Sequence, residues 1–250
     1  MFLRPRRGVE RIPEVLAERL GGRVRTNARV VEVAEREGRF RVRGDGEGQR
    51  ADAVVLAPEA HVSAGLLASL APAATAELQG IDYASTGVVL MLYPDGTARD
   101  LPSGTGFVVP RGKAPMTAST WLSNKWPSEA FGSRAVIRCY VGGSGAEDVL
   151  DATDEDLIEA CARHLAAVVS LPDRPDHAAV IRWPHAMPQY GVGHPERVAR
   201  IRASLPAGIF VTGQAYDGVG IPDCIRGAAE TATAVLAHLA GAPTQKETVA

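Results

Sequence analysis

The stretch Gly208-Ile-Phe-Val-Thr-Gly-Gln-Ala-Tyr-Asp-Gly-Val-Gly-Ile-Pro-Asp-Cys-Ile225 reads as a buried strand, a glycine loop and a helix start in immediate succession. Gly218 and Gly220 lack the Cβ atoms that would keep a ligand away from the backbone. Pro222 suits a first helical position, where no amide hydrogen is needed. The N–H groups of such a helix point into the loop, and the helix dipole favours negative charge there. The stretch predicts an anion cradle, although a plain strand-to-helix connector satisfies the same pattern.

Two stretches upstream of this loop add to the pattern, Trp183-Pro-His-Ala-Met-Pro-Gln-Tyr-Gly-Val-Gly-His194 and Ser119-Thr-Trp-Leu-Ser-Asn-Lys-Trp-Pro127. Together with the loop they resemble the C-terminal part of the FAD-dependent coproporphyrinogen III/protoporphyrinogen oxidases, within the amine-oxidase-like flavoprotein superfamily. The resemblance runs from about Gly8 to Leu239. It implies FAD as cofactor, a porphyrinogen as substrate and O2 as electron acceptor, in haem biosynthesis.

The resemblance also implies which residues contact the flavin. In the family, backbone amides of the matching loop face the isoalloxazine, which here corresponds to Gly218, Val219, Gly220 and Ile221. Trp183 matches a tryptophan that packs near the flavin. A tight turn and a core aromatic residue are the structural alternatives at these positions.

Three further residues follow from matched segments. Val30, within Asn27-Ala-Arg-Val-Val-Glu-Val33, matches a strand residue whose backbone touches adenine, although any strand valine fits the pattern. Asn124 and Lys125 lie between two tryptophans and could contact substrate propionates, whereas a solvated loop is the alternative. The histidines and cysteines do not form a metal-ligand pattern, and no catalytic side chain is identified.

The family's N-terminal dinucleotide fingerprint, G-x-G-x-x-G after a first strand, is missing from this sequence. The segment around Gly8 resembles instead the middle of such an enzyme. We therefore expect a truncated chain or one half of a split protein, with an N-terminal complementing chain as partner. Losing the pyrophosphate contacts predicts weak or no FAD binding by this chain alone, because each such charged hydrogen bond contributes roughly 1.5–3 kcal/mol.

The hydrophobic patterns predict an α/β fold with α+β character: a partial FAD/NAD(P)-binding Rossmann-like domain with an inserted mixed, largely antiparallel substrate-binding domain. The expected segments are an FAD-domain part at 1–82, the substrate-binding domain at 83–204, an FAD-domain return at 205–243 and a disordered tail at 244–250. Ala51–Ala57 reads as a strand buried on both faces of a parallel sheet.

The remaining elements follow from local spacing and turn residues. Helices are expected at Arg11–Leu20, His61–Leu70, Ala73–Leu78, Thr153–Val169, His194–Ser204 and Pro222–Leu239, and strands at Val24–Ala34, Arg39–Arg43, Gly87–Tyr93, Gly106–Val109, Thr117–Trp121, Ala135–Val141, Ala179–Trp183 and Gly208–Thr212.

Composition limits the function classes. The 250 residues are 46% hydrophobic with a formal net charge of -2, which gives no basic bias toward nucleic acid. No apolar run approaches the ~20 residues of a membrane span. The odd number of cysteines, without C-x-x-C spacing, fits a reducing cytosol, with peripheral membrane contact left open.

Three functions stay open at this point. The first is a coproporphyrinogen-type oxidase represented by its C-terminal part. The second is a non-catalytic half that needs an N-terminal partner. The third is another flavin oxidase or desaturase acting on an amine or a carotenoid precursor, which the absence of a paired-aromatic cage disfavours.

Overall fold

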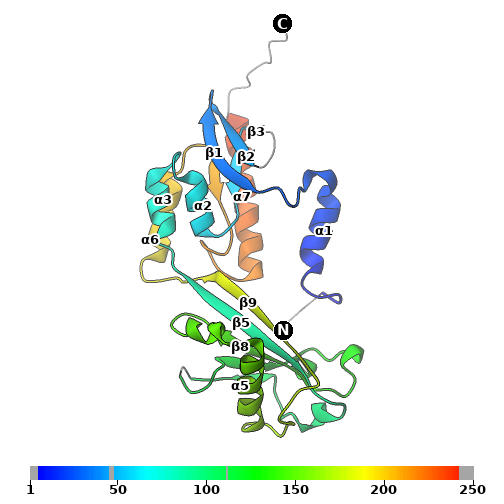
Figure 1. Cartoon of the computed structure of the whole chain (residues 1–250). Coiled ribbons are helices and arrows are strands. Elements are labelled where there is room, and N and C mark those ends of the chain that lie inside the picture. The colour runs from blue at the N-terminus through cyan, green and yellow to red at the C-terminus, as the bar shows by residue number, and fades with distance from the viewer. Residues whose placement is uncertain (1–4, 45–47, 111, 242–250) are drawn as a thin grey trace.

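Two long antiparallel strands, β5 (Tyr83–Leu92) and β9 (His177–Pro188), connect the two bodies of the molecule (Figure 1). The computed structural model describes residues 5–44, 48–110 and 112–241. We call residues 83–188 the lower body and the described residues before and after them the upper body, following Figure 1. The lower body is inserted into the upper one, as the sequence predicted.

The upper body contains two small sheets. One pairs β4 (Val54–Leu56) in parallel with β10 (Ile209–Val211), and the other is antiparallel and consists of β1 (Val30–Arg36), β2 (Arg39–Gly44) and β3 (Gln49–Ala51). The predicted hairpin and the parallel pairing are confirmed. The expected burial on both faces is wrong, because the side chain of Val55 is 44% exposed and has no cover among the described residues.

Three helices, α2 (Ala60–Leu67), α3 (Pro72–Gln79) and α6 (His194–Ser204), pack beside these sheets. The carboxylate of Glu77 on α3 accepts a hydrogen bond of 2.6 Å from Arg200 Nε on α6. Buried Val198 and Ile201 place α6 in the hydrophobic core of the upper body. We therefore propose that the substrate-binding segment ends with β9, before α6, rather than at 204.

Two helices of the upper body are weakly packed. Helix α1 (Arg11–Leu20), followed by the 3-10 turn η1 (Gly21–Arg23), contains no buried residue and lies apart from the rest of the body in Figure 1. In α7 (Ile221–Gly241) only Gly227 is buried, and a cavity of about 510 Å³ separates this helix from β10. Both helices lie where the sequence predicted them. The predicted tail at 244–250 falls outside the described residues.

The lower body is a five-stranded antiparallel sheet in the order β6-β7-β8-β5-β9, with β6 at Gly106–Val108, β7 at Ala118–Trp121 and β8 at Val136–Gly142. Helix α5 (Asp154–Ala166) covers one face and starts at Thr153, whose hydroxyl accepts a hydrogen bond from the Asp156 amide. The core between them is apolar and includes Val89, Met91, Ile137, Val141, Leu157 and Leu165. The largely antiparallel character is confirmed.

Strand β9 extends beyond the predicted Ala179–Trp183 and takes in Pro184 and Pro188. Proline is tolerated here because β9 is an edge strand, so one side of its backbone has no ladder partner. The pairing with β5 shifts register between Ala84 and Thr86, and His185 adopts a φ of 47° at this irregularity. Short helical turns complete the body: α4 (Leu122–Lys125), η2 (Thr97–Asp100), η3 (Glu129–Phe131) and η4 (Glu147–Asp151).

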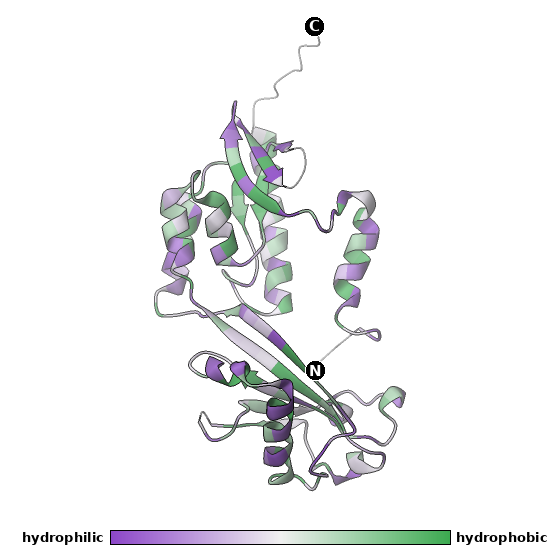
Figure 2. Ribbon diagram, viewed as in Figure 1, coloured by the Kyte–Doolittle hydropathy of each residue, from purple (hydrophilic) through white to green (hydrophobic). Residues whose placement is uncertain are grey.

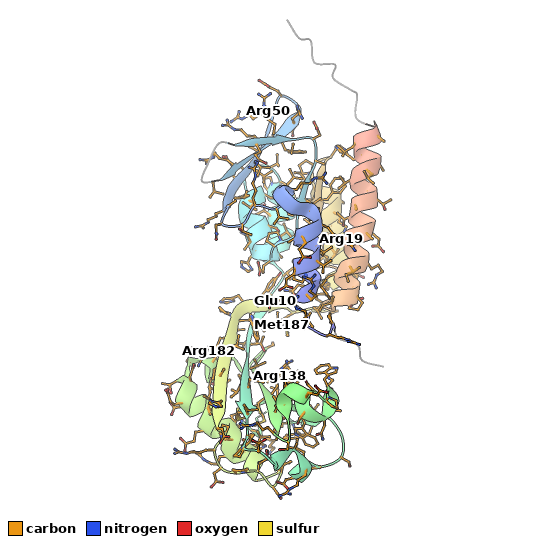
Figure 3. The ribbon with its side chains drawn as sticks, turned by 90° about the vertical axis from the view of Figure 1, so that its right-hand side faces the viewer. Glu10, Arg19, Arg50, Arg138, Arg182 and Met187 are labelled. Carbon is orange, nitrogen blue, oxygen red and sulfur yellow. The ribbon has the colours of Figure 1, made fainter. Side chains whose placement is uncertain are left out.

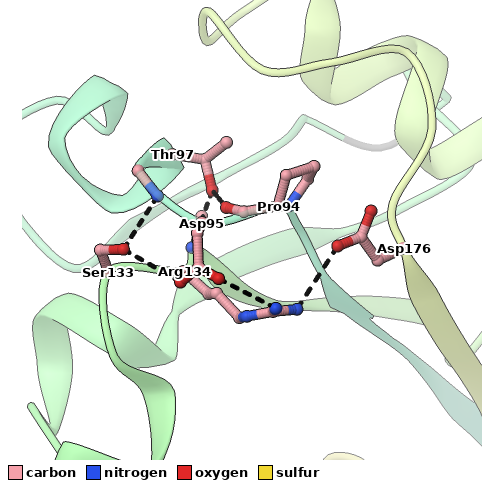
Figure 4. Close-up of polar contacts among 8 residues, drawn as sticks. Pro94, Asp95, Thr97, Ser133, Arg134 and Asp176 are labelled. Atoms are coloured by element: carbon pink, nitrogen blue, oxygen red, sulfur yellow. Dashed lines mark hydrogen bonds and ion pairs between the residues drawn. The ribbon is translucent and has the colours of Figure 1, made fainter.

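A polar cluster fixes the end of the lower body (Figure 4). Arg134 bridges two carboxylates, with Nη2 3.0 Å from Asp95 and Nη1 3.4 Å from Asp176. The Ser133 hydroxyl accepts from the Gly96 amide and donates to Asp95. These contacts join the turn after β5 to the segments that lead into β8 and β9.

Candidate functional site

The glycine loop between β10 and α7 is open to solvent. The side chains of Val219 and Ile221 are 54% and 47% exposed. The amides of Val219, Gly220 and Ile221 make no hydrogen bond within the described part of the chain, so these N–H groups at the start of α7 stay available to a ligand.

Gly218 differs from the other three residues. Its amide donates a hydrogen bond of 2.9 Å to the Tyr190 hydroxyl, which in turn donates to the Gln214 carbonyl at 2.5 Å. Tyr190 thus reaches this donor from the segment after β9, while the predicted flavin contact of Gly218 stays a prediction. The Gln214 amide also bonds the Ala186 carbonyl at 2.8 Å, so the loop is fastened to β9 at two points.

The environment of Tyr190 holds its ring in place. The ring stacks on His194 with centroids 3.9 Å apart, and His194 Nε2 lies 3.2 Å from the Tyr216 carbonyl oxygen. Burial raises the pKa of the Tyr190 phenol above its ordinary value, more than the hydrogen bond from Gly218 lowers it. The phenol consequently stays protonated at neutral pH and keeps donating to Gln214.

Gly218 and Gly220 have a packing role that the sequence did not reveal. Gly218 has a φ of 142°, and a Cβ there would come within 2.6 Å of Asp223 Cγ. A Cβ on Gly220 would lie 2.9 Å from an Asp223 carboxylate oxygen. The glycines thus make room for Asp223, whose charge is paired with Arg226 at 2.9 Å.

A cavity of about 400 Å³ lies on the face of the lower sheet opposite α5. The volume falls in the range of ligand-binding clefts, roughly 300–1,000 Å³. Figure 2 shows hydrophobic residues along the lower part of β5, which forms its floor. Its lining is mostly apolar and comes from three strands: Thr86, Val88, Leu90, Arg138, Tyr140, Ile181, Trp183 and Met187.

The strand register explains how these side chains gather. Thr86 lies opposite Trp183, Val88 lies between Tyr140 and Ile181, and Leu90 lies opposite Arg138. Because side chains alternate between faces along a strand, all of these project away from α5. The apolar side chains are therefore on a face that the described residues leave open, which is typical of a binding surface.

Arg138 and Tyr140 are the polar pair in this cavity. Arg138 Nη1 donates to the Tyr140 hydroxyl at 3.4 Å, and its guanidinium carbon lies 5.9 Å from the ring centroid. Burial raises the pKa of the Tyr140 phenol, but hydrogen bonds with Arg138 and Thr120 and the charges of Arg138 and Lys125 outweigh it. The pKa lies below its ordinary value as a result.

The structure separates the residues expected to bind ligands. Trp183, 44% exposed, lines the sheet cavity, whereas Val30 lies at the start of β1 in a different sheet from the strand that leads into the glycine loop. Figure 3 shows Met187 where the two bodies meet and Arg138 further down the sheet. The ligand roles of Val30, Trp183, Val219, Gly220 and Ile221 stay predictions.

The two proposed propionate contacts have different environments. The Asn124 amide donates to the Pro102 and Gly104 carbonyls at 3.4 and 3.2 Å, so its N–H groups hold a loop of the protein. Lys125 lies with its ammonium 4.8 Å from the Trp126 ring centroid and close enough to Tyr140 to influence its pKa. The substrate roles of Asn124 and Lys125 both stay predictions.

Sequence reasoning missed three residues of these sites. Tyr190 was within a motif already quoted, but its bond to Gly218 joins residues from different elements. Arg138 and Tyr140 alternate with buried Ile137, Cys139 and Val141 along β8. That alternation within an apolar strand was the signal that could have identified them.

Comparison with known proteins shows the relationships of the chain. Residues 2–236 match the family model described as flavin containing amine oxidoreductase. Coproporphyrinogen III oxidase of Bacillus subtilis is 36% identical over 179 residues, covering 70% of this chain and 38% of the relative. The chloroplastic protoporphyrinogen oxidase of Nicotiana tabacum is 27% identical, covering 94% of this chain and 46% of the relative.

A crystal structure from Exiguobacterium sp. 255-15, whose name assigns it provisionally to protoporphyrinogen oxidase, superimposes with a TM-score of 0.81 at 29% identity. The superposition covers 93% of this chain and 51% of the other. The chain thus spans about two fifths to one half of the length of the proteins it matches. Among the described helices, none has the length and apolar run needed to cross a bilayer.

Proposed function

Because this chain belongs to the family of flavin-containing amine oxidoreductases, we propose that it forms the C-terminal portion of an FAD-dependent oxidase that converts a porphyrinogen to the porphyrin. Coproporphyrinogen III is the favoured substrate and protoporphyrinogen IX the alternative, since identity to the B. subtilis coproporphyrinogen III oxidase exceeds identity to the tobacco protoporphyrinogen oxidase, 36% against 27%. We place this activity in haem biosynthesis in the cytosol, and peripheral membrane contact stays a prediction.

The residues around the glycine loop fit a flavin. The free amides of Val219, Gly220 and Ile221 supply donors at the start of α7, where the helix dipole favours the negative charge of a reduced isoalloxazine. Pairing with Arg226 offsets the charge of Asp223 beside the loop. A flavin bound at this loop would supply the two-electron acceptor for hydride removal from the porphyrinogen, with O2 as the proposed final acceptor and hydrogen peroxide as its product.

The chain's own contribution is to bind and orient. Tyr190 fixes the loop through Gly218, so the neighbouring amides are held in place before a ligand arrives. The apolar sheet face, with Trp183 and Ile181, offers a surface for the apolar ring of a tetrapyrrole. The single observation that carries the porphyrinogen assignment is the likeness to coproporphyrinogen III oxidases. The positively charged group of Arg138 in this cavity is consistent with it.

The positive charge of the sheet cavity also helps to decide between a porphyrinogen and an amine as substrate. A protonated amine entering the sheet cavity would meet the guanidinium of Arg138, and like charges in a partly buried site repel each other. A substrate with carboxylates would be attracted instead. This favours a porphyrinogen over an amine.

We further propose that activity requires an N-terminal complementing segment, in the same polypeptide or a separate one, that carries the dinucleotide fingerprint. Three features support it: the exposed side of the two-stranded sheet at Val55, the absence of buried residues in α1 and the shallow packing of α7. Each leaves apolar surface that a further layer of the same domain would bury.

A direct test uses the purified chain with and without the N-terminal half of the B. subtilis relative. The complemented protein is expected to retain FAD, seen as flavin absorbance, and to turn coproporphyrinogen III into fluorescent porphyrin with consumption of O2. The chain alone is expected to be colourless and inactive. A complemented, flavin-loaded protein that oxidises amines and leaves porphyrinogens unchanged would overturn the substrate assignment.

A further inference from the structure

We propose that Arg138 is a specificity-determining residue that binds a carboxylate of the substrate in the sheet cavity and makes the site prefer porphyrinogens with more carboxylates. The inference rests on the proposed function, because it names what one residue of the substrate site recognises. Coproporphyrinogen has four propionates and protoporphyrinogen has two, so a carboxylate contact could separate them.

The first observation is that Arg138 has no acidic partner in the part of the chain that the structure describes. The other half-buried arginines of the lower body are paired: Arg134 bridges Asp95 and Asp176, and Arg182 pairs with Asp154. Arg138 contacts the Tyr140 phenol instead and has no ion pair with any carboxylate of the described residues. A partly buried charge without a counter-charge is unfavourable unless a ligand provides one.

The second observation is the surroundings of Arg138. In the three register rows that pass through Thr86, Val88 and Leu90, Arg138 is the one charged side chain. Its neighbours across the strands are Leu90 and Thr120. An arginine on an ordinary solvated sheet face would have polar neighbours, whereas this one is held at an apolar surface that suits a flat ligand with a charged edge.

The third observation is that Tyr140 orients the guanidinium and that a second cation lies nearby. Tyr140 accepts one hydrogen bond from Nη1, which leaves the remaining N–H groups of the guanidinium for a carboxylate in bidentate geometry. The charge of Lys125 on α4 also reaches Tyr140. Lys125 is not among the residues that line the cavity, so Arg138 is the cation that lines it.

The test measures binding of two porphyrins to the full chain by fluorescence titration. Coproporphyrin III, with four carboxylates, is compared with mesoporphyrin IX, with two. The variants are Arg138→Gln, which keeps hydrogen-bond donors without charge, and Arg138→Lys, which keeps charge without the planar fork. Arg99→Gln serves as the matched control, because Arg99 is a highly exposed arginine of the same body that lies outside the cavity.

The wild-type chain is expected to bind coproporphyrin III more tightly than mesoporphyrin IX, with affinity falling as salt rises. Arg138→Gln should weaken coproporphyrin binding by about 10-fold or more and reduce the preference, because a charged hydrogen bond is lost. Arg138→Lys should recover part of the affinity, and Arg99→Gln should match the wild type. Arg138→Gln should not lower the temperature of thermal unfolding, since Arg138 has no ion pair among the described residues to lose.

Equal coproporphyrin affinity in the wild type and Arg138→Gln, or no porphyrin binding by the wild-type chain, would overturn the inference. The fate of the proposed function is separate. Carboxylate-dependent binding without oxidation by the complemented enzyme would reject the function and leave the inference standing. Oxidation of coproporphyrinogen with the same kcat/KM in the wild type and Arg138→Gln would support the proposed function and reject the inference about Arg138.

Discussion

The phenol of Tyr190 and the amide of Gly218 are joined by a hydrogen bond of 2.9 Å that links the segment after β9 to the loop before α7. The same hydroxyl donates to the Gln214 carbonyl, so one side chain satisfies two backbone groups of an exposed loop. Because β9 also carries the sheet cavity, this bond places the glycine loop in a fixed relation to the strand that lines the proposed substrate site. The loop proposed to bind the cofactor is thereby hydrogen-bonded to the segment that follows the strand proposed to bind the substrate.

Replacing Tyr190 by phenylalanine should loosen this link. We expect Tyr190→Phe to lower the free energy of unfolding by about 1 kcal/mol and to weaken FAD binding by the complemented enzyme several-fold, since the loop loses its anchor. Thr97→Val is the matched control, because it removes a hydroxyl that accepts a similar bond, from the Ala135 amide, in the lower body away from the loop. Thermal melts measure the stability of both variants, and flavin titration measures their affinity for FAD. Identical flavin affinity in the two variants would show that Tyr190 only stabilises the fold.

The structure also predicts how strongly an alanine at each glycine position would destabilise the fold. Gly218→Ala should destabilise by about 1–3 kcal/mol, because Gly218 has a positive φ and its new Cβ would press on Asp223. Gly220→Ala should cost less, since its φ is ordinary and its Cβ would meet the end of the Asp223 side chain. Gly65→Ala in α2 is the control and should be neutral or stabilising, because nothing lies near its Cβ. Chemical denaturation measures the free energy of unfolding of each variant. A Gly218→Ala variant as stable as Gly65→Ala would contradict the predicted order of stability.

Local patterns were enough to predict most of the fold. The apolar runs at Val54–Leu56 and Ile209–Val211 indicated buried strands, and they pair in parallel. The length of β9 was missed because Pro184 and Pro188 read as strand breakers, whereas tolerance for proline depends on being at a sheet edge. Edge position is a property of the whole sheet, so no local pattern contains it.

The site was harder to predict for a related reason. The role proposed for Arg138 depends on the absence of a carboxylate partner among the described residues, and its cross-strand neighbours Thr120 and Leu90 belong to two other strands. Likewise Asn124 looked available in the sequence, but its amide bonds two carbonyls of a distant loop. The spacing of residues along the chain identifies polar side chains that are candidates for binding a ligand. The hydrogen bonds and ion pairs of the folded protein decide which of these side chains remain available.

The Glu77–Arg200 pair between α3 and α6 should make stability depend on pH. The hydrogen bond from Arg200, opposed by partial desolvation and helped by the charges of Arg200 and Arg197, holds the pKa of Glu77 below its ordinary value of 4.5. A lowered folded-state pKa means that the stabilisation is present above the ordinary pKa and is lost as pH falls through the folded value.

Glu77→Gln should therefore lower the Tm of the chain most at neutral pH, and the difference from wild type should shrink as the pH falls well below 4.5. Glu35→Gln is the control, because Glu35 is an exposed carboxylate of the upper body without an ion pair among the described residues. Calorimetric melts over a pH series provide the measurement. A Tm difference that stays constant down to the acid limit contradicts the assigned pKa shift.

The exposed face of α7 provides a test of the complementing segment. Leu236 is 67% exposed, so Leu236→Glu should change the stability of the chain alone by no more than about 0.5 kcal/mol. If an N-terminal segment packs on this face, the new carboxylate would be buried against apolar groups in the complemented enzyme, which is strongly unfavourable. Complementation, measured as flavin retention and porphyrin formation, should then fall at least 10-fold. Ala237→Glu is the matched control, because it adds the same charge at an exposed position of α7 about 100° around the helix from Leu236. Full complementation by Leu236→Glu would exclude this face as the contact surface.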